Sequence, residues 1–201
     1  TPNDRASEPH VAGRRAFVEV LEPALRLVVC GAGHDAIPVV AGGAALGWNV
    51  VVVDDRPAFL THERFPGASA FVAVERPDQV AALAPLDART FVLLMSHAFL
   101  RDKDYLRALL GTPVRAITML GPTPRTRRML DELRSEGVAI GPEDEERIHG
   151  PAGLDLGAEG PEEIATAIVA EIVAVRRGRR GGFLRERVGP IHDRDVDGPF
   201  R

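Results

Sequence analysis

Residues 27–38 read Leu-Val-Val-Cys-Gly-Ala-Gly-His-Asp-Ala-Ile-Pro, and this short stretch decides the fold. An apolar run ends at Gly31, and small residues follow at Gly33 and Ala36. In this G-x-G-x-x-A spacing the first glycine allows a tight turn and the second lets a phosphate approach the backbone. A helix starting here would direct free N–H groups at an anion. The stretch therefore predicts a strand, a nucleotide-binding turn and a helix, with an unliganded turn as the alternative.

A second apolar strand follows and ends in acidic residues. Residues 49–54 are Asn, four valines and Asp54, and Asp55 and Arg56 come next. In the dinucleotide-binding pattern, an acidic residue about 20 positions after the glycines binds a ribose hydroxyl. Asp54 has this position and disfavours a 2′-phosphate, whereas Arg56 weakens that argument.

Beyond this unit, short apolar runs alternate with helical patterns. Strands are predicted at 25–30, 49–54, 71–74, 91–95 and 115–120, where β-branched or aromatic residues are frequent. Helices are predicted at 34–46, 77–83, 104–110 and 124–136, and a final one runs from Pro161 to about Gly178. This alternation predicts an α/β fold with a doubly wound parallel sheet, Rossmann-like, and a C-terminal helix.

The two ends of the chain differ from its middle. Residues 1–24 read as a linker with a remnant strand over 16–23, and residues 25–178 as one Rossmann-like domain. Residues 179–201 are rich in Arg, Gly and Asp without periodicity, which predicts a disordered tail. The chain does not begin with Met, which is consistent with a fragment of a longer protein.

Composition argues against several classes of function. The formal net charge of −4 gives no electrostatic basis for binding nucleic acid. The longest apolar run, 36–53, contains Pro38 and several glycines, so it reads as helix, turn and strand and not as a membrane span. Cys30 is the sole cysteine, which excludes an intrachain disulfide and a thiolate zinc cluster. We expect a reducing, cytoplasmic location.

Polar residues that follow the predicted strands should gather in one crevice, because parallel strands end at the same edge of the sheet. Ser96 and His97 follow the strand at 91–95, and His97 is either a ligand contact or a structural histidine. Arg125 and Thr126 either contact a phosphate or cap their helix. The candidate binding residues at this edge are Gly31, Gly33, His34, Asp35, Asp54, Arg56, Ser96, His97 and Gly121.

Two further features have alternative interpretations. Cys30 precedes the glycine turn and is either a small buried hydrophobe or a thiolate that contacts a bound metal. The glycine-rich segment 147–165 contains Arg147, His149 and Asp155. It forms either a wall or lid of the ligand site or a plain loop over the sheet.

Five segments, taken in this order, resemble one known family. They are GAGHDAIP (31–38), VVVDDRPAF (51–59), ERFPGA (63–68), RTRRML (125–130) and RIHGPAGLDLGAEGPEEIATAIVAEIVAVRRG (147–178). Together they resemble the C-terminal Rossmann domain of the XdhC/CoxI family over about residues 16–178. These proteins are maturation factors for xanthine dehydrogenase, carbon monoxide dehydrogenase and related molybdenum hydroxylases.

The resemblance implies a chaperone that binds the molybdenum cofactor (molybdopterin). Such a chaperone supports sulfuration of the cofactor by a cysteine desulfurase and helps deliver it to the molybdenum hydroxylase apoenzyme. The family's N-terminal domain, with its cysteine-bearing segment, is absent from this sequence. The chain is therefore expected to act with a separate N-terminal-type XdhC domain or to be part of a longer protein.

For this cofactor, the glycine turn would take a phosphate, while His34, Asp35 and His97 hydrogen-bond pterin or oxo groups. The sequence shows neither a Ser-His-Asp order nor a Walker-type phosphate loop, so we expect a binding protein without turnover of its own. Two alternatives use the same fingerprint: an NAD(P)-dependent oxidoreductase, and a nucleotide-sensing regulatory domain.

Overall fold

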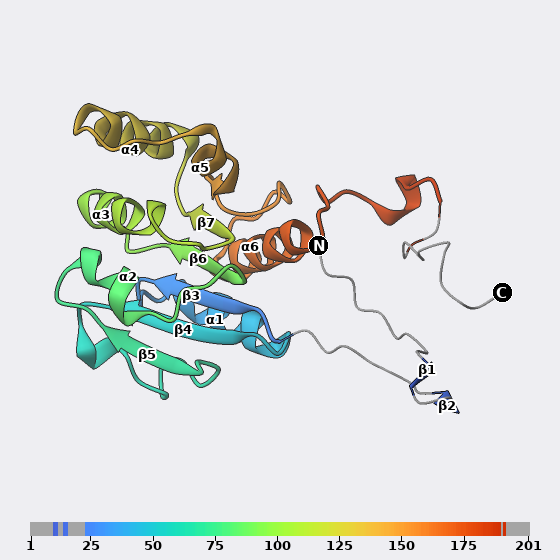
Figure 1. The fold of residues 1–201 in the computed structure, drawn as a ribbon. Helices are drawn as coiled ribbons and strands as arrows, with labels where there is room; N and C mark the ends of the chain where they lie inside the picture. Colours follow the sequence, from blue (N-terminus) through green and yellow to red (C-terminus); the bar gives the residue numbers. More distant parts are fainter. Residues whose placement is uncertain (1–9, 12–13, 16–22, 190, 192–201) are drawn as a thin grey trace. The chain divides into compact units, whose positions relative to one another are not determined.

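The computed structural model describes residues 10–11, 14–15, 23–189 and 191 (Figure 1). The chain divides into two compact units, one of Leu25–Gly181 and one made of the two terminal segments. The candidate site lies entirely in the larger unit.

The terminal unit contains little regular structure in its described part. Strands β1 (His10–Val11) and β2 (Arg14–Arg15) pair antiparallel, and η3 (Leu184–Glu186) is a turn of 3₁₀ helix. The remnant strand predicted over 16–23 falls outside the described residues except for its last position. The predicted boundaries of the domain and its tails stay predictions.

The larger unit is built on a six-stranded sheet in which every pair of neighbours is parallel. The order across the sheet is β5-β4-β3-β6-β7-β8, so the chain starts in the middle, winds to one edge and then winds to the other. This order is that of the doubly wound dinucleotide-binding fold and confirms the predicted fold class. The strands are β3 (Arg26–Cys30), β4 (Asn49–Asp54), β5 (Ala70–Ala73), β6 (Thr90–Leu94), β7 (Ala116–Met119) and β8 (Ile148–His149).

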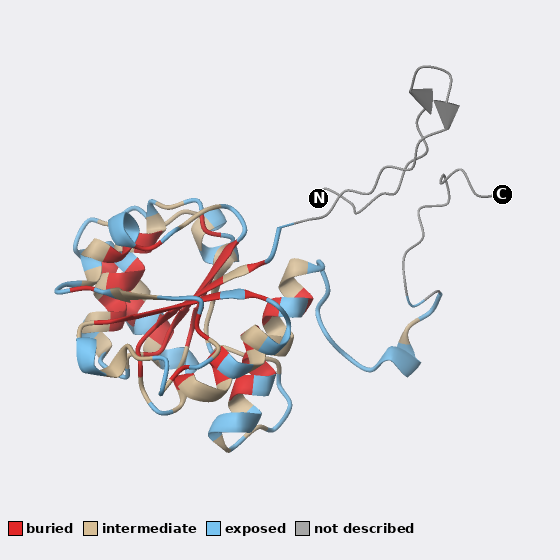
Figure 2. Ribbon diagram, turned by 90° about the horizontal axis from the view of Figure 1, so that it is seen from below, coloured by how far each residue is buried: buried red, intermediate tan, exposed pale blue. Residues whose placement is uncertain are grey.

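Helices cover both faces of this sheet. Leu27 and Val29 of β3 face a core shared with α1 (Ala36–Ala45) and α6 (Pro161–Arg176). Val28 and Cys30 face a second core, shared with α2 (Val80–Leu83), α3 (Phe99–Leu110) and α4 (Thr123–Ser135). Because both faces are covered, the strands form the buried centre of the molecule (Figure 2).

Several elements differ from the prediction. The helix predicted from residue 34 begins at Ala36, and the one predicted from 104 begins at Phe99. The sequence predicts no element for residues 138–146, where the structure has a short helix, α5 (Pro142–Arg147). The segment 147–165, expected to be a wall, a lid or a loop, contains the sixth strand, β8. Two 3₁₀ turns, η1 (Pro57–Phe59) and η2 (Pro77–Gln79), complete the unit. A strand of two residues has no periodicity, so the sequence offered no signal for β8.

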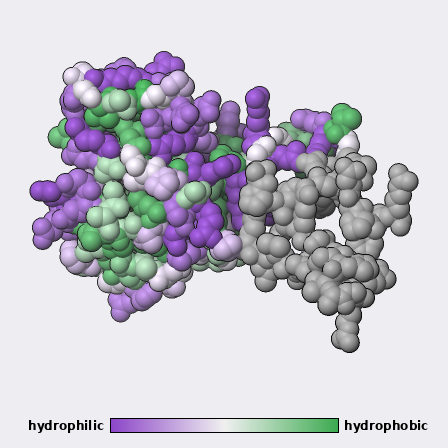
Figure 3. Space-filling model, viewed as in Figure 1, coloured by the Kyte–Doolittle hydropathy of each residue, from purple (hydrophilic) through white to green (hydrophobic). Residues whose placement is uncertain are grey.

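The surface of the protein is mixed in character. Figure 3 shows hydrophilic residues over much of one face, with apolar residues between them. Folded proteins normally expose a large share of apolar surface, so the mixture alone does not indicate a binding site. Among the residues that the structure describes, no helix combines the length and apolar character needed to cross a membrane.

Candidate functional site

The site begins where the chain reverses its winding direction, between the carboxyl ends of β3 and β6. Gly31 has a φ of +125°, and a Cβ there would lie 2.6 Å from the carbonyl oxygen of Met95. Its N–H donates to the Val53 carbonyl at 2.8 Å. A side chain is therefore excluded twice, by conformation and by space. This glycine shapes the crevice in which doubly wound proteins bind their ligands.

Gly33, the second glycine of the turn, makes room for an acidic side chain of the protein itself. A Cβ at Gly33 would lie 2.6 Å from Oδ1 of Asp35. Asp35 is the N-cap residue of α1, but its side chain makes no capping hydrogen bond. The carboxylate instead turns back over Gly33, into the space that the sequence pattern assigns to a ligand phosphate.

His97 holds this carboxylate from the opposite side of the crevice. Its Nε2 lies 2.7 Å from Asp35 Oδ2, although the two residues are 62 positions apart. His97 has a φ of +61°, and within the described chain it is the sole non-glycine residue with a positive φ. Such a conformation is sparsely populated and is maintained by surrounding contacts. The structure therefore brings Gly33, Asp35 and His97 into contact with one another, with His34 exposed beside them.

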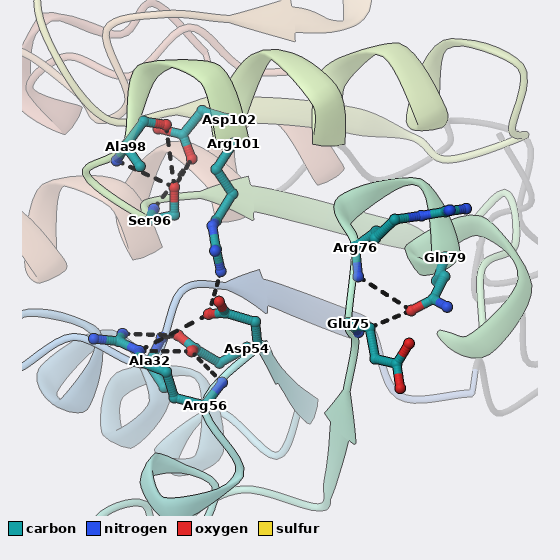
Figure 4. Close-up of polar contacts among 11 residues, drawn as sticks. Ala32, Asp54, Arg56, Glu75, Arg76, Gln79, Ser96, Ala98, Arg101 and Asp102 are labelled. Atoms are coloured by element: carbon teal, nitrogen blue, oxygen red, sulfur yellow. Dashed lines mark hydrogen bonds and ion pairs between the residues drawn. The ribbon is translucent and has the colours of Figure 1, made fainter.

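Asp54 lies where a ribose hydroxyl would be bound, but its carboxylate is fully occupied (Figure 4). Oδ2 accepts from the Ala32 N–H at 2.6 Å and from Arg56 Nη2 at 3.0 Å. Oδ1 accepts from the Arg56 N–H and Nε, each at 2.9 Å. Four donors use all the lone-pair positions of a carboxylate. Burial alone would raise the pKa of Asp54, but these hydrogen bonds outweigh it and hold the pKa well below its usual range.

A cluster of arginines surrounds the end of β4. Arg101, at the start of α3, forms an ion pair with Asp55. The guanidinium carbons of Arg56 and Arg64 lie 4.2 Å and 4.7 Å from the centre of the Phe59 ring. Arg64 also donates to the Ala32 carbonyl at 3.3 Å, which places its guanidinium at the glycine turn. Sequence reasoning did not select Arg64, although the ERFPGA segment that resembles the XdhC/CoxI family contains it.

The ends of β6 and β7 border a small cavity of about 180 Å³. Asp102, a buried residue of α3, accepts from the Ser96 N–H and hydroxyl at 3.1 and 2.6 Å and from Arg125 at 2.7 Å. Gly121 has a φ of +113° and lets the Arg125 side chain pass over it. Sequence reasoning missed Asp102 because it lies inside a helix and not after a strand. The cavity is lined by Met95, His97, Asp102, Leu120, Gly121 and Arg125.

Other predicted site residues lie elsewhere or do structural work. Arg147 donates to the carbonyls of Leu110, Thr112 and Val114, in the loop between α3 and β7. It therefore lies at the amino-terminal ends of the strands, opposite the glycine turn. His149 contacts Glu171 of α6 at 3.1 Å. Asp155 is exposed in the loop that follows. All three residues belong to the 147–165 segment, and none of them contacts the glycine turn.

Cys30 is fully buried in the core beneath α2, α3 and α4. Burial, and then the nearby charges of Asp102 and Asp54, raise the pKa of its thiol far above the usual range. A protonated, enclosed thiol behaves as a small hydrophobe. This arrangement favours the structural interpretation of Cys30 over metal contact.

The crevice offers a particular set of polar groups. The backbone N–H groups of Gly33, His34 and Asp35 have no acceptor within the described part of the chain. Oδ1 of Asp35 is an acceptor beside them. No group of His, Cys, Asp and Glu side chains in the described residues could hold a bare metal ion. Free N–H donors beside a carboxylate acceptor fit a ligand that has both acceptors and donors, such as a pterin or a nucleotide.

Comparisons with known proteins point to one family. The profile of the XdhC Rossmann domain matches residues 27–172. In Bacillus subtilis (strain 168), a probable xanthine dehydrogenase subunit is 32% identical over 161 residues, which cover 80% of this chain and 46% of the relative. The uncharacterized protein YqeB of Escherichia coli (strain K12) is 32% identical over 176 residues, covering 87% of this chain and 31% of that protein.

A solved structure gives the same result. The crystal structure of a xanthine dehydrogenase from Bacillus halodurans matches with a TM-score of 0.69 and 35% identity, covering 79% of this chain and 44% of that chain. The chain thus spans less than half the length of each of these relatives.

Proposed function

The chain belongs to the XdhC family through its Rossmann domain, and we propose that it binds the molybdenum cofactor in the crevice between β3 and β6. In this proposal it is a maturation chaperone without turnover of its own. It presents the cofactor for sulfuration by a cysteine desulfurase and passes it to an apoenzyme of the xanthine dehydrogenase or carbon monoxide dehydrogenase type. The names of the relatives from the two Bacillus species support a link to a molybdenum hydroxylase system.

The observation that carries the proposal is the polar character of the crevice at the winding reversal. Unpaired backbone N–H groups at the start of α1 and the Asp35–His97 pair face the same turn. A pterin has both ring N–H donors and carbonyl acceptors, and its phosphate or dinucleotide tail is anionic. Helix N-terminal N–H groups suit that tail. When bound, the cofactor itself would supply the molybdenum and its redox chemistry, and the protein would bind and orient it.

The size of the cavity limits how much of the cofactor it encloses. At about 180 Å³ the cavity beside His97 is smaller than the roughly 300–1,000 Å³ typical of pockets for drug-sized ligands. It would therefore receive one end of the cofactor and leave the rest accessible. An accessible metal centre suits a protein that hands its ligand to others.

An NAD-dependent oxidoreductase is the second candidate, favoured by the strand order and the glycine spacing. Its weakness lies at Asp54, since the carboxylate already accepts four hydrogen bonds from Arg56 and the Ala32 N–H. A ribose hydroxyl would have to displace one of these donors. A nucleotide-sensing domain would meet the same obstacle.

The ligand decides between these functions. Protein purified from cells that make the molybdenum cofactor should release a fluorescent pterin after acid oxidation and should contain molybdenum by elemental analysis. Tight binding of NADH together with hydride transfer to any substrate, without pterin, would contradict the proposal.

Partners would be identified by affinity capture from the native host. We expect a molybdenum hydroxylase apoenzyme, a cysteine desulfurase and a separate N-terminal-type XdhC domain.

A further inference from the structure

The carboxylates around the crevice differ in how many hydrogen bonds they can still accept. Asp54 accepts four and has no capacity left. Asp102 accepts three, from Ser96 and Arg125, and is buried. Asp55 is paired with Arg101 and lies near Arg56. A ligand that needs a carboxylate acceptor must therefore find it elsewhere.

Asp35 is the carboxylate with open capacity. Its Oδ2 is bonded to His97, whereas its Oδ1 has no partner within the described residues. The side chain is 25% exposed, so a ligand can reach it. Because Gly33 has no Cβ, Oδ1 can lie directly over the turn.

The orientation of this oxygen is fixed by its neighbours. His97 approaches Asp35 from the loop after β6, with a φ of +61° that few residues adopt unless contacts hold them there. The same histidine lines the cavity of about 180 Å³. The His97 side chain thus contacts the Asp35 carboxylate and also lines the cavity. A carboxylate oriented by a second residue is a recognisable device for specificity.

A carboxylate over the glycine turn changes what the turn can bind. Asp35 repels a phosphate placed directly on Gly33, but it accepts from neutral N–H groups. A planar edge with two adjacent N–H donors matches the two oxygens and open lone pairs of a carboxylate. The 2-amino-4-oxopyrimidine ring of a pterin has such an edge, formed by its ring N3–H and its 2-amino group. The corresponding ring of guanine has the same edge.

We propose that Asp35, positioned by His97, is the specificity-determining acceptor for the 2-amino-4-oxopyrimidine edge of the ligand. This inference rests on the proposed binding of a pterin cofactor and names the part of it that the protein recognises. The phosphate tail then lies away from Asp35, toward the guanidinium of Arg64 at the glycine turn.

Paired ligands that differ in one group test the proposal. Pterin carries the 2-amino group, whereas lumazine has an oxygen there that would face the carboxylate. Binding of each is followed by ligand fluorescence or calorimetry with the full chain. We expect wild-type protein to bind pterin at least about tenfold more tightly than lumazine, because the carboxylate of Asp35 would face an oxygen of lumazine where pterin offers an N–H donor. In Asp35→Asn the ratio should fall to within roughly threefold.

Two further variants separate recognition from stability. His97→Asn keeps a residue type that tolerates positive φ but removes the imidazole, and it should lower the pterin-to-lumazine ratio partially. Asp131→Asn removes an exposed carboxylate of α4 and should leave the ratio unchanged. Thermal unfolding of all three variants shows that each remains folded.

The possible results separate the role of Asp35 from the proposed chaperone function. If Asp35→Asn keeps the full preference for pterin, or if wild-type protein binds the molybdenum cofactor without any such preference, the inference is wrong and the chaperone function stands. If guanosine monophosphate is preferred over inosine monophosphate through Asp35 and pterin does not bind, the recognised edge is that of guanine and the pterin function fails. Binding of neither class overturns both.

Discussion

Gly31 and Gly33 belong to one short motif, yet the structure uses them in different ways. Gly31 combines a φ of +125° with a Cβ position only 2.6 Å from the backbone carbonyl of Met95. Gly33 lacks that φ, and the atom nearest to its missing Cβ is Oδ1 at the end of the Asp35 side chain. The first glycine is therefore needed for the fold, and the second for the arrangement of the site.

Alanine at each position should reveal this difference. Gly31→Ala is expected to lower the free energy of unfolding by about 3 kcal/mol, from backbone strain and overpacking against the backbone of Met95, just after β6. Gly33→Ala should change it by less than about 1 kcal/mol while displacing Asp35. Urea unfolding measures both values. Equal losses at the two positions would contradict the separate roles, and Gly33→Val should keep the fold but weaken ligand binding further.

Asp54 makes stability depend on pH in a predictable direction. Its pKa is lower in the folded protein than in the unfolded chain, so the unfolded state binds the proton first. The stabilisation is complete above the unfolded pKa of about 3.9 and is lost as the pH falls below it. Asp54→Asn should therefore cost about 2 kcal/mol at pH 7 and progressively less toward pH 3. Urea unfolding across this range checks it, and a constant difference would contradict the assignment.

Sequence reasoning located residues at the site better than it assigned their partners. It placed Asp54 at the end of β4 and His97 at the crevice mouth, because residues after parallel strands must gather there. It did not foresee that Arg56, two positions after Asp54, would occupy its carboxylate. Side-chain rotamers decide such pairings, and the order of residues does not contain them. Asp35 over Gly33 was missed for the same reason.

At the scale of elements, the side chain of Glu171 in α6 holds the 147–165 segment in place. One of its carboxylate oxygens lies 3.1 Å from His149 Nδ1, and the other accepts from the Gly153 N–H at 2.8 Å. The segment that sequence reasoning treated as a wall or loop is thus tied to α6 at two points. Its position depends on one side chain of a well-formed helix.

Removing that side chain should loosen the segment locally. Glu171→Ala is expected to lower the free energy of unfolding by about 1–2 kcal/mol, because two hydrogen bonds are lost. Hydrogen exchange in residues 150–160 should become faster while the strands stay protected. Glu162→Ala, on an exposed face of the same helix, serves as the control. Unchanged exchange in Glu171→Ala would show that other contacts hold the segment.

The elements that sequence reasoning predicted well are those with strong local patterns. The apolar runs of β3 and β4 have two covered faces, and their observed ends agree with the prediction within one residue. Helix α6 has Pro161 at its start and a regular apolar stripe. By contrast, β8 pairs only Ile148 and His149 with β7, and two residues are too few to show a strand pattern. Helix α5 does have local signals, with Pro142 at its start and acidic residues in its first turn, but it buries none of its residues and has no apolar stripe.

At the scale of the whole molecule, the unit of Leu25–Gly181 contains the entire sheet and both cores. A chain limited to these residues should fold by itself. Its free energy of unfolding should lie within about 1 kcal/mol of that of the full chain, with a single cooperative transition. Limited proteolysis of the full chain should leave this unit intact. Early cleavage between Val50 and Leu120 would contradict a continuous domain.

The central place of β3 has a consequence for the nascent chain on the ribosome. One neighbour, β4, is made soon after β3, but the other edge waits for β6, in which Thr90 pairs with Arg26. Until that strand emerges, the future centre of the sheet presents an unpaired apolar edge. Such edges recruit strands from other chains. Translation that stalls just before β6 would therefore hold the protein in its most aggregation-prone form, and co-translational chaperones should be needed most in that interval.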